Sequence, residues 1–490
     1  MRLSYLAYAF EIIFRYFGFI ILTPIVFSFV FKEYESIIPF LITATISIVL
    51  ANLLKLLLRK TNIENLNDIK KSEGLFIVAV SWIVAGLIAS LPYMFYGMSL
   101  IDALFESASG ITTTGATICT GGEYPHAIYF WRALTQWLGG MGIIVLFIAI
   151  LPQFAIAGRQ MFFAEMPGPN EEKFTPRVRN TASALWKIYA IMTLILTVLL
   201  SLAGMPYFDA FCNSLSTLSA GGFSTNAQST MGYNSYLITW IMMIFIILAG
   251  VNFNLQYRAY TKFDFKAFFK NEEFRAYIGI FLGISALVAI SLVTIDKFDL
   301  KYAITHSMYQ VISLMTSTGS TSADYSQWDF TTKVLLFIAM FTGGCASSAG
   351  GGIKIARWVL IGKIMKMEVK KILHPNAVLN IKMDNVIIPK EILYQTVMFV
   401  SFYLVLIAIS VIVVSILEQS SVIGISGSIA SIGNIGPAFG QVIGPMGSYE
   451  TLHPLSKLVL IFDMYVGRLE LIPFLVMLEP DFWTFRLTNK

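Results

Sequence analysis

Four short segments of small and polar residues in this chain end on a glycine, and their chemistry suits the binding of a cation. They are residues 112–115, 218–222, 316–319 and 432–436. Glycine adopts backbone angles that are closed to other residues, so successive carbonyl groups can point at one axis. Such carbonyls can replace the water around an ion. Because none of the segments contains Asp or Glu, they suit a weakly hydrated monovalent cation better than a divalent one.

These segments form an internal repeat. Their final glycines lie 107, 97 and 117 residues apart, and each period reads membrane helix, short apolar stretch, glycine turn and membrane helix. Small residues are also common where membrane helices pack, but four copies in register favour a pore. The candidate selectivity-filter residues are Thr113, Thr114, Gly115, Ala220, Gly221, Gly222, Ser317, Thr318, Gly319, Asn434, Ile435 and Gly436.

The composition requires a membrane protein. Of the 490 residues, 56% are hydrophobic and only 13% are charged, which excludes an ordinary soluble domain. Apolar runs of about 20 residues can span a bilayer. We predict ten such segments, at 8–31, 36–58, 74–96, 130–152, 183–204, 235–257, 275–295, 332–361, 391–417 and 455–478. The first is too long for the apolar region of a cleavable signal peptide.

The stretches before the glycines are too short to span. Residues 101–113, 208–219, 303–316 and 422–433 are helix-like, but each contains too few residues at 1.5 Å per residue. We expect re-entrant pore helices, which membranes tolerate only where irregular backbone is buried or lines an aqueous cavity. Their carboxyl ends would carry about −0.5 charge near mid-membrane and so favour a cation.

Charge gives the expected orientation. Lys and Arg cluster in 59–71, 159–187, 258–275 and 354–390, so these connections and both termini should be cytoplasmic. The basic residues flank membrane segments instead of forming one compact domain, so nucleic-acid binding is not expected. The opposite connections carry the carboxylates Asp102, Asp209, Asp299 and Asp324, which would make the outer vestibule acidic; ordinary loop charges are the alternative.

Other site chemistries find little support in the sequence. The cysteines Cys119, Cys212 and Cys345 form no CxxC pair, and the four histidines lack metal-ligand spacing. There is no nucleophile–base constellation that would indicate an enzyme. No nucleotide-binding fingerprint occurs, so nucleotide control would come through another subunit. The basic cytoplasmic connections would meet that partner or anionic membrane lipid.

A glycine cluster interrupts the eighth predicted span. Residues 343–352 contain Gly343, Gly344, Gly350, Gly351 and Gly352, and each glycine costs about 1 kcal/mol in a helix. We expect an unwound loop in the inner mouth of the pore, where it would act as a gate; a packing kink is the alternative.

Three charged residues near the pore carry further expectations. Arg468 lies within the last span, so it should face the pore or a partner. Its partner would be carbonyls of the 343–352 loop or, alternatively, Glu470 or Asp463. Lys354 is expected to reach the cytoplasmic interface. Glu106 could accept hydrogen bonds from filter amides.

These motifs together resemble a known family. TTTGAT (112–117), SAGGFST (219–225), TSTGST (316–321) and NIGPAFG (434–440) are similar to the filter loops of the Trk/Ktr/HKT superfamily of potassium-translocating membrane subunits. GGCASSAGGGIK (343–354), AGRQMFFAEMPGP (157–169) and GRLE (467–470) resemble its bacterial Trk branch, which has two extra N-terminal helices.

The resemblance implies an all-α integral membrane protein in the bacterial inner membrane. Two N-terminal helices would precede four membrane-helix, pore-helix, membrane-helix units around one pseudo-fourfold pore. The expected divisions are 1–72, 73–158, 159–260, 261–372 and 373–490. The resemblance also implies a homodimer and a cytosolic ring of nucleotide-binding regulatory subunits.

The transported ion implied by the resemblance is K⁺, without an organic cofactor. Gly115, where members that admit sodium often have Ser, favours potassium, whereas Ser320 replaces a frequent aromatic residue. K⁺ would be held at Thr113, Thr114, Leu218, Ser219, Ala220, Ser317, Thr318, Asn434 and Ile435. We expect channel-like uptake with the 343–352 loop and Arg468 as the gate. The alternative is a symporter coupled to H⁺ or Na⁺, with Asp463 and Glu470 as its only clear carboxylates within the spans.

Overall fold

The computed structural model describes residues 3–58, 71–119, 124–142, 178–377, 379–469 and 480. These residues are mostly helical, and the one sheet among them is a hairpin of β1 (Lys382–Met383) and β2 (Val386–Ile387). Several predicted features lie wholly or partly outside the described residues. They are the 157–169 motif, the basic connections 59–71 and 159–187, the ends of the spans 130–152 and 455–478, and Glu470.

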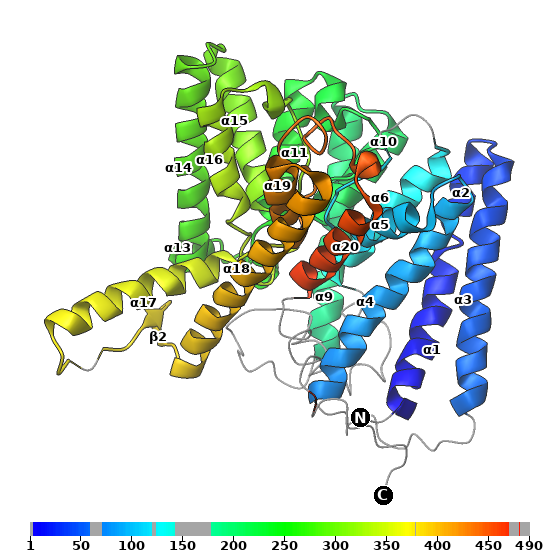
Figure 1. The fold of residues 1–490 in the computed structure, drawn as a ribbon, viewed down its shortest axis with the longest axis horizontal. Coiled ribbons are helices and arrows are strands. Elements are labelled where there is room, and N and C mark those ends of the chain that lie inside the picture. Colours follow the sequence, from blue (N-terminus) through cyan, green and yellow to red (C-terminus); the bar gives the residue numbers. More distant parts are fainter. Residues whose placement is uncertain are drawn as a thin grey trace, which may run out of the picture.

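The main body contains four units of the same helical order. Each unit has a first helix, a short pore helix and a second helix, and Figure 1 shows them gathered side by side. The units are α4 (Lys71–Met94), α5 (Leu100–Ile111) and α6 (His126–Met141); α9 (Val178–Leu202), α10 (Tyr207–Leu218) and α11 (Tyr236–Ala249); α14 (Glu272–Thr294), α15 (Leu300–Met315) and α16 (Phe330–Met340); and α18 (Lys390–Glu418), α19 (Ser421–Ile432) and α20 (Pro454–Arg468).

The four predicted pore helices are present as short helices. They contain 12, 12, 16 and 12 residues, and their carboxyl-terminal halves are buried. Hydroxyl or carboxylate caps begin three of them: Ser99 for α5, Asp299 for α15 and Ser420 for α19 accept from backbone amides in the first turn. The pore helix α10 instead starts directly after Pro206.

Contacts between the units run around a ring. The pore helix α10 packs on α6 of the unit before it, and α15 packs on α11 in the same way. At the other end of the chain α20 packs on α5, so the fourth unit meets the first. This arrangement places the ends of the pore helices together at the centre.

The first N-terminal span is broken. Instead of one helix over 8–31, the chain forms α1 (Leu3–Ile20) and α2 (Pro24–Val30), with Pro24 opening the second helix. With α3 (Ile37–Leu58) they stand at one side of the molecule, drawn in dark blue in Figure 1. They pack on α4 and α6, outside the ring of pore helices.

Two further spans depart from continuous helices. The segment predicted at 235–257 is α11 followed by α12 (Phe253–Lys262), bent by 102°. The segment predicted at 332–361 is α16, a loop, and α17 (Ile355–Leu373), which projects from the body in Figure 1. Within the described residues, six helices are long and apolar enough to cross a membrane, or seven if the bent pair is one span.

Short elements complete the described chain. They are η1 (Tyr34–Ser36), η3 (Ser229–Tyr233), α13 (Lys266–Lys270), η4 (Tyr325–Gln327) and η5 (Tyr449–Thr451). The helices α3, α9, α14 and α18 expose many large apolar side chains, for example Leu57, Leu194, Ile290 and Ile412. A bilayer accepts such a surface, whereas water does not.

Candidate functional site

All four pore helices end in the same backbone motif. Thr113, Ala220, Ser317 and Asn434 have left-handed φ values of 55°, 55°, 58° and 52°. The next amide, at Thr114, Gly221, Thr318 or Ile435, donates to the carbonyl five residues earlier at 2.8–2.9 Å. This is a Schellman helix end, which usually has glycine at the left-handed position. None of the four has glycine there, so each helix end carries conformational strain.

The filter glycines fit against one another in a closed ring. A Cβ atom placed on Gly115 would lie 2.2 Å from the carbonyl oxygen of Gly221, and one on Gly222 would lie 2.0 Å from that of Thr318. A Cβ on Gly319 would lie 1.9 Å from the Ile435 oxygen, and one on Gly436 would lie 2.5 Å from the Thr114 oxygen. Each glycine therefore contacts a carbonyl of the next loop, and the fourth loop returns to the first.

The glycines are needed for conformation as well as space. Gly115, Gly222, Gly319 and Gly436 have φ values between 71° and 94°, where side chains are strained. Nearby, Thr113 Oγ1 and Asn434 Oδ1 are buried oxygen atoms without a hydrogen-bond partner. The ring thus gathers oxygen atoms around one point without a carboxylate in the filter segments.

A buried ion pair supports the first loop from behind. Glu106 on α5 accepts from Arg132 Nε of α6 at 2.7 Å, and both side chains are almost fully buried. The carboxylate also accepts from the Ile118 amide at 2.8 Å, three residues beyond Gly115, whereas within the described residues no amide of the segment 112–115 donates to it. Arg132 in turn donates to Thr117 and to the Ser224 carbonyl, so the pair joins the first and second loops.

Other side chains hold the remaining loops. Gln136 of α6 donates to the Gly221 carbonyl at 2.6 Å and accepts from the Phe223 amide at 3.1 Å. Tyr309 bonds the hydroxyl of Ser320 at 2.8 Å, so Ser320 has a polar partner within its own unit. Tyr449 donates to the Gly436 carbonyl at 2.7 Å. Each loop is therefore fixed by long side chains behind it.

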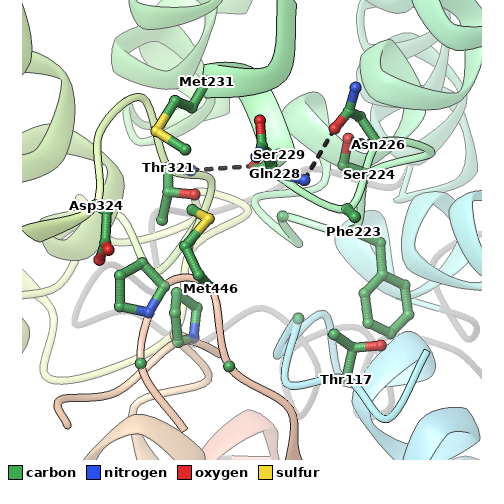
Figure 2. Close-up of a pocket in the computed structure, with 18 of the residues that line it drawn as sticks. Thr117, Phe223, Ser224, Asn226, Gln228, Ser229, Met231, Thr321, Asp324 and Met446 are labelled. Carbon is green, nitrogen blue, oxygen red and sulfur yellow. Dashed lines mark hydrogen bonds between the residues drawn. The ribbon is translucent and has the colours of Figure 1, made fainter. Parts of the chain in front are cut away.

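A cavity of about 590 Å³ borders the four glycine loops. Gly115, Gly222 and Gly319 line it, and Figure 2 shows Met231, Met446 and Asp324 among its other lining residues. Of the four carboxylates expected around the outer vestibule, Asp324 lines this cavity. Asp102 forms an ion pair with Lys457 at 2.5 Å, because α5 of the first unit packs against α20 of the fourth.

The glycine-rich segment between α16 and α17 is an unwound loop, as predicted. A Cβ on Gly350 would lie 2.5 Å from the Thr316 carbonyl oxygen, and one on Gly351 would lie 2.6 Å from that of Gly433. The Gly351 amide also donates to the Ser317 hydroxyl. The loop therefore touches the third and fourth filter segments. Its two ends are joined by backbone hydrogen bonds, from the Gly343 amide to the Ile353 carbonyl and from the Ile355 amide to the Gly344 carbonyl.

Arg468 joins this loop to the first unit. Its guanidinium donates to the Ala349 carbonyl at 2.7 Å and to the carbonyls of Gly139 and Gly140 at 2.7 and 2.9 Å. The predicted contact with a loop carbonyl is confirmed, whereas Asp463 is bonded to Ser410. A cation at this position faces carbonyls from two units across the region beneath the filter.

Lys354 does not reach the cytoplasmic interface, so that expectation is wrong. The side chain is buried, and its ammonium group donates back to the Gly350 carbonyl four residues earlier. A buried ammonium group needs a nearby acceptor, and the fold of the loop places the Gly350 carbonyl within reach of Lys354.

Known proteins share this arrangement. The family model described as "TrkH: Cation transport protein" matches residues 38–483, which is most of the chain. The chain belongs to the TrkH family. It is thus a multi-pass membrane protein of a cation-transporter family.

Individual TrkH relatives agree over nearly the whole length. The Trk system potassium uptake protein TrkH of Salmonella typhimurium is 37% identical over 422 residues, which cover 85% of this chain and 87% of the relative. TrkG of Escherichia coli is 31% identical over 467 residues, covering 94% and 95%. The crystal structure of the potassium transporter TrkH from Vibrio parahaemolyticus matches with a TM-score of 0.87 and 32% identity, covering 99% of this chain and all of the other.

Several supporting residues of this TrkH-family chain are missed by sequence reasoning. Arg132, Gln136 and Glu273 stand near the ends of predicted spans, where charged or polar residues normally meet the interface. For the Glu106 pair, the available signal is a second charged residue, Arg132, inside the next predicted span. Nothing in the sequence alone points to Gln136.

Proposed function

We propose that this chain takes up potassium through a channel-like pore of its own, with the four glycine loops as the selectivity filter. The closed ring of glycines and neighbouring carbonyls carries the proposal. Its buried oxygens would replace the hydration shell of a monovalent cation. The names of the TrkH and TrkG relatives, which are potassium uptake proteins, support K⁺ as the cargo.

In this proposal the loop at 343–352 is the gate. It lies against the third and fourth filter segments, and Arg468 adds a fixed positive charge beside it. Ions could pass only when the loop and this charge move aside. The five glycines allow such movement because they impose few side-chain constraints.

The wider assembly is proposed from the resemblance. The chain would form a homodimer in the bacterial inner membrane, with both termini in the cytoplasm. A cytosolic ring of nucleotide-binding regulatory subunits would control the gate, because the chain has no nucleotide fingerprint. No nucleic-acid partner, enzymatic activity or organic cofactor is proposed.

Ion-coupled symport is the competing mechanism. It would need a carboxylate that exchanges with solvent near the substrate path. Asp463 is bonded to Ser410, which also bonds Ser428 of the fourth pore helix. This position favours a structural role, so channel-like flux is the better-supported mechanism.

The test compares K⁺ and Na⁺ flux into liposomes for two serine variants. Gly115→Ser should lower the K⁺/Na⁺ flux ratio at least ~10-fold, which corresponds to about 1.4 kcal/mol. Gly97→Ser is the matched control, because Gly97 has φ +84°, close to the +83° of Gly115, and nothing lies within 4 Å of its Cβ position. Equal ratios in both variants would contradict the filter assignment.

A coupled mechanism has a separate signature. If K⁺ entry into proteoliposomes moves protons or sodium in a fixed ratio, symport replaces the channel-like mechanism. If K⁺ distributes according to the membrane potential alone, the channel-like proposal holds.

A further inference from the structure

One buried carboxylate connects the two ends of the loop at 343–352. Glu273, in the first turn of α14, accepts a hydrogen bond from the Ala346 amide at 2.6 Å. The same oxygen accepts from the Ala356 amide at 3.2 Å. The residue is only 4% exposed, so these charge-assisted bonds form out of water and are stronger than neutral ones.

Helix ends reinforce these bonds. Ala356 lies in the first turn of α17, whose N-cap residue, Lys354, provides no side-chain cap. Glu273 supplies a cap from another helix, and its charge also faces the amino end of α14. A negative charge at either helix start is favourable because of the helix dipole. Removing it would leave two buried amides and an uncapped helix start.

The support for Glu273 extends to the described cytoplasmic hairpin. Asp384, in the turn between β1 and β2, accepts from the Glu272 amide and from Asn271 Nδ2, both at 2.7 Å. Asn271 caps α14 by accepting from the Phe274 amide. Lys363 of α17 forms an ion pair with Glu272 and donates to the Lys382 carbonyl at 2.6 Å. The hairpin therefore fixes the turn that carries Glu273.

We propose that Glu273 is a positioning residue that latches the loop at 343–352 against the filter, and that the hairpin around Asp384 holds this latch in place. A displacement of the hairpin would shift the first turn of α14 and withdraw the carboxylate from Ala346 and Ala356. The loop would then lose its connection to α14. The functional consequence, a rise in flux, rests on the proposed gate role of this loop.

Cys345 offers a direct readout of the latch. It is a free cysteine inside the loop, adjacent to Ala346, and it is fully buried. Cys119 and Cys212 are also free and buried but belong to other units, so they serve as internal references. The rate of maleimide attachment to each cysteine, measured by mass spectrometry on the purified full chain, reports loop release separately from unfolding.

The variants are Glu273→Ala, Glu273→Gln and Asp384→Ala. Glu273→Ala should raise the labelling rate of Cys345 at least ~10-fold while leaving Cys119 and Cys212 unchanged. Glu273→Gln keeps an acceptor oxygen but loses the charge, so its rate should be intermediate. Asp384→Ala changes an exposed residue and should raise the rate less, in the same direction. Ser285→Ala is the matched control, because Ser285 is buried on α14 and makes no hydrogen bond there.

The outcomes separate the latch from the gate. Unchanged Cys345 labelling in Glu273→Ala and Glu273→Gln would overturn the latch, and so would an equal rise in Ser285→Ala. If Glu273→Ala does not fold, unchanged labelling in Glu273→Gln and Asp384→Ala is sufficient to overturn it. Faster labelling with K⁺ flux into liposomes also raised is the expected result. Faster labelling of Cys345 with unchanged K⁺ flux would support the latch role of Glu273 and overturn the gate role of the loop.

Discussion

The filter loops and the loop at 343–352 are both glycine-rich and unwound within membrane helices, yet they are held in different ways. Each filter loop begins at the Schellman end of its own pore helix. There a backbone amide of the loop donates to the carbonyl five residues earlier in that helix. The gate candidate has no such helix end. Its backbone bonds instead to Ala249 and Gly250 of another unit and to Ile353 and Ile355 at its own far end. Three long side chains, those of Glu273, Lys354 and Arg468, add to these bonds.

This difference bears on the proposed gate. A loop closed by its own helix can move only if that helix unwinds, whereas a loop held in part by long side chains can loosen when those side chains withdraw. Under the proposed function, glycine would therefore serve a fixed geometry in the filter loops and a movable one at 343–352. The predictions below test this contrast.

The largest effect is expected at the buried ion pair behind the first filter loop. Arg132→Met leaves the Glu106 carboxylate buried without its partner, which costs about 3–5 kcal/mol. The thermal midpoint in detergent should fall strongly. The double variant Glu106→Gln/Arg132→Met removes both charges and should recover part of the loss. No recovery would mean that the two residues act independently.

A substitution at a filter glycine should distinguish the effect of close packing from the effect of backbone strain. Gly222→Ala places a Cβ 2.0 Å from the Thr318 oxygen, so the neighbouring loop must shift and the K⁺/Na⁺ flux ratio should fall. Gly204→Ala carries a similar strain at φ +97° with open space around it. It should cost about 1 kcal/mol of stability and leave the ratio unchanged. A loss of selectivity in both would contradict the packing argument.

The gate side of the contrast is tested by Arg468→Lys. Lysine keeps the charge but cannot reach the carbonyls of both Ala349 and Gly139 with one planar group. Basal K⁺ flux should rise several-fold, on the order of 1 kcal/mol, while the K⁺/Na⁺ ratio stays the same. A changed ratio with unchanged flux would place Arg468 with the filter.

The smallest effect is expected from one hydroxyl group. Tyr449→Phe removes the bond to the Gly436 carbonyl and should cost about 1 kcal/mol of stability, with a small loss of selectivity. Tyr325→Phe is the comparison, because its hydroxyl binds the Ala438 carbonyl, two residues beyond that glycine. It should lower the thermal midpoint similarly and preserve the flux ratio. The reverse order would contradict the assigned roles.

The sequence predicts the repeated parts of this molecule well. The short apolar stretches before the glycines predict the four pore helices, and the glycines mark where each one ends. The break at 343–352 follows from five glycines, and the contact of Arg468 follows from the cost of a charge within the membrane. These features depend on local composition, which a single sequence contains.

The parts that sequence reasoning misses depend on contacts between distant segments. Lys354 looks like an interface anchor until the loop folds back and offers it the Gly350 carbonyl. Glu273 stands near a span end and looks solvated, but α17 brings the Ala356 amide to it. No proline follows Ala249 to predict the 102° bend between α11 and α12. At this bend the loop at 343–352 contacts the chain, and the Cys345 amide donates to the Gly250 carbonyl.

The closed ring of four unlike units within one chain has a consequence for variation. In a pore assembled from four identical subunits, every substitution enters the ring four times. Here a substitution enters once, so the third unit can supply the glycine loop at 343–352, the fourth unit Arg468 and the first unit Gln136 without changing the other units. Because the four units belong to one chain, each unit can take a different role, which an exactly symmetric tetramer does not allow. A single substitution then changes one position of the ring instead of four.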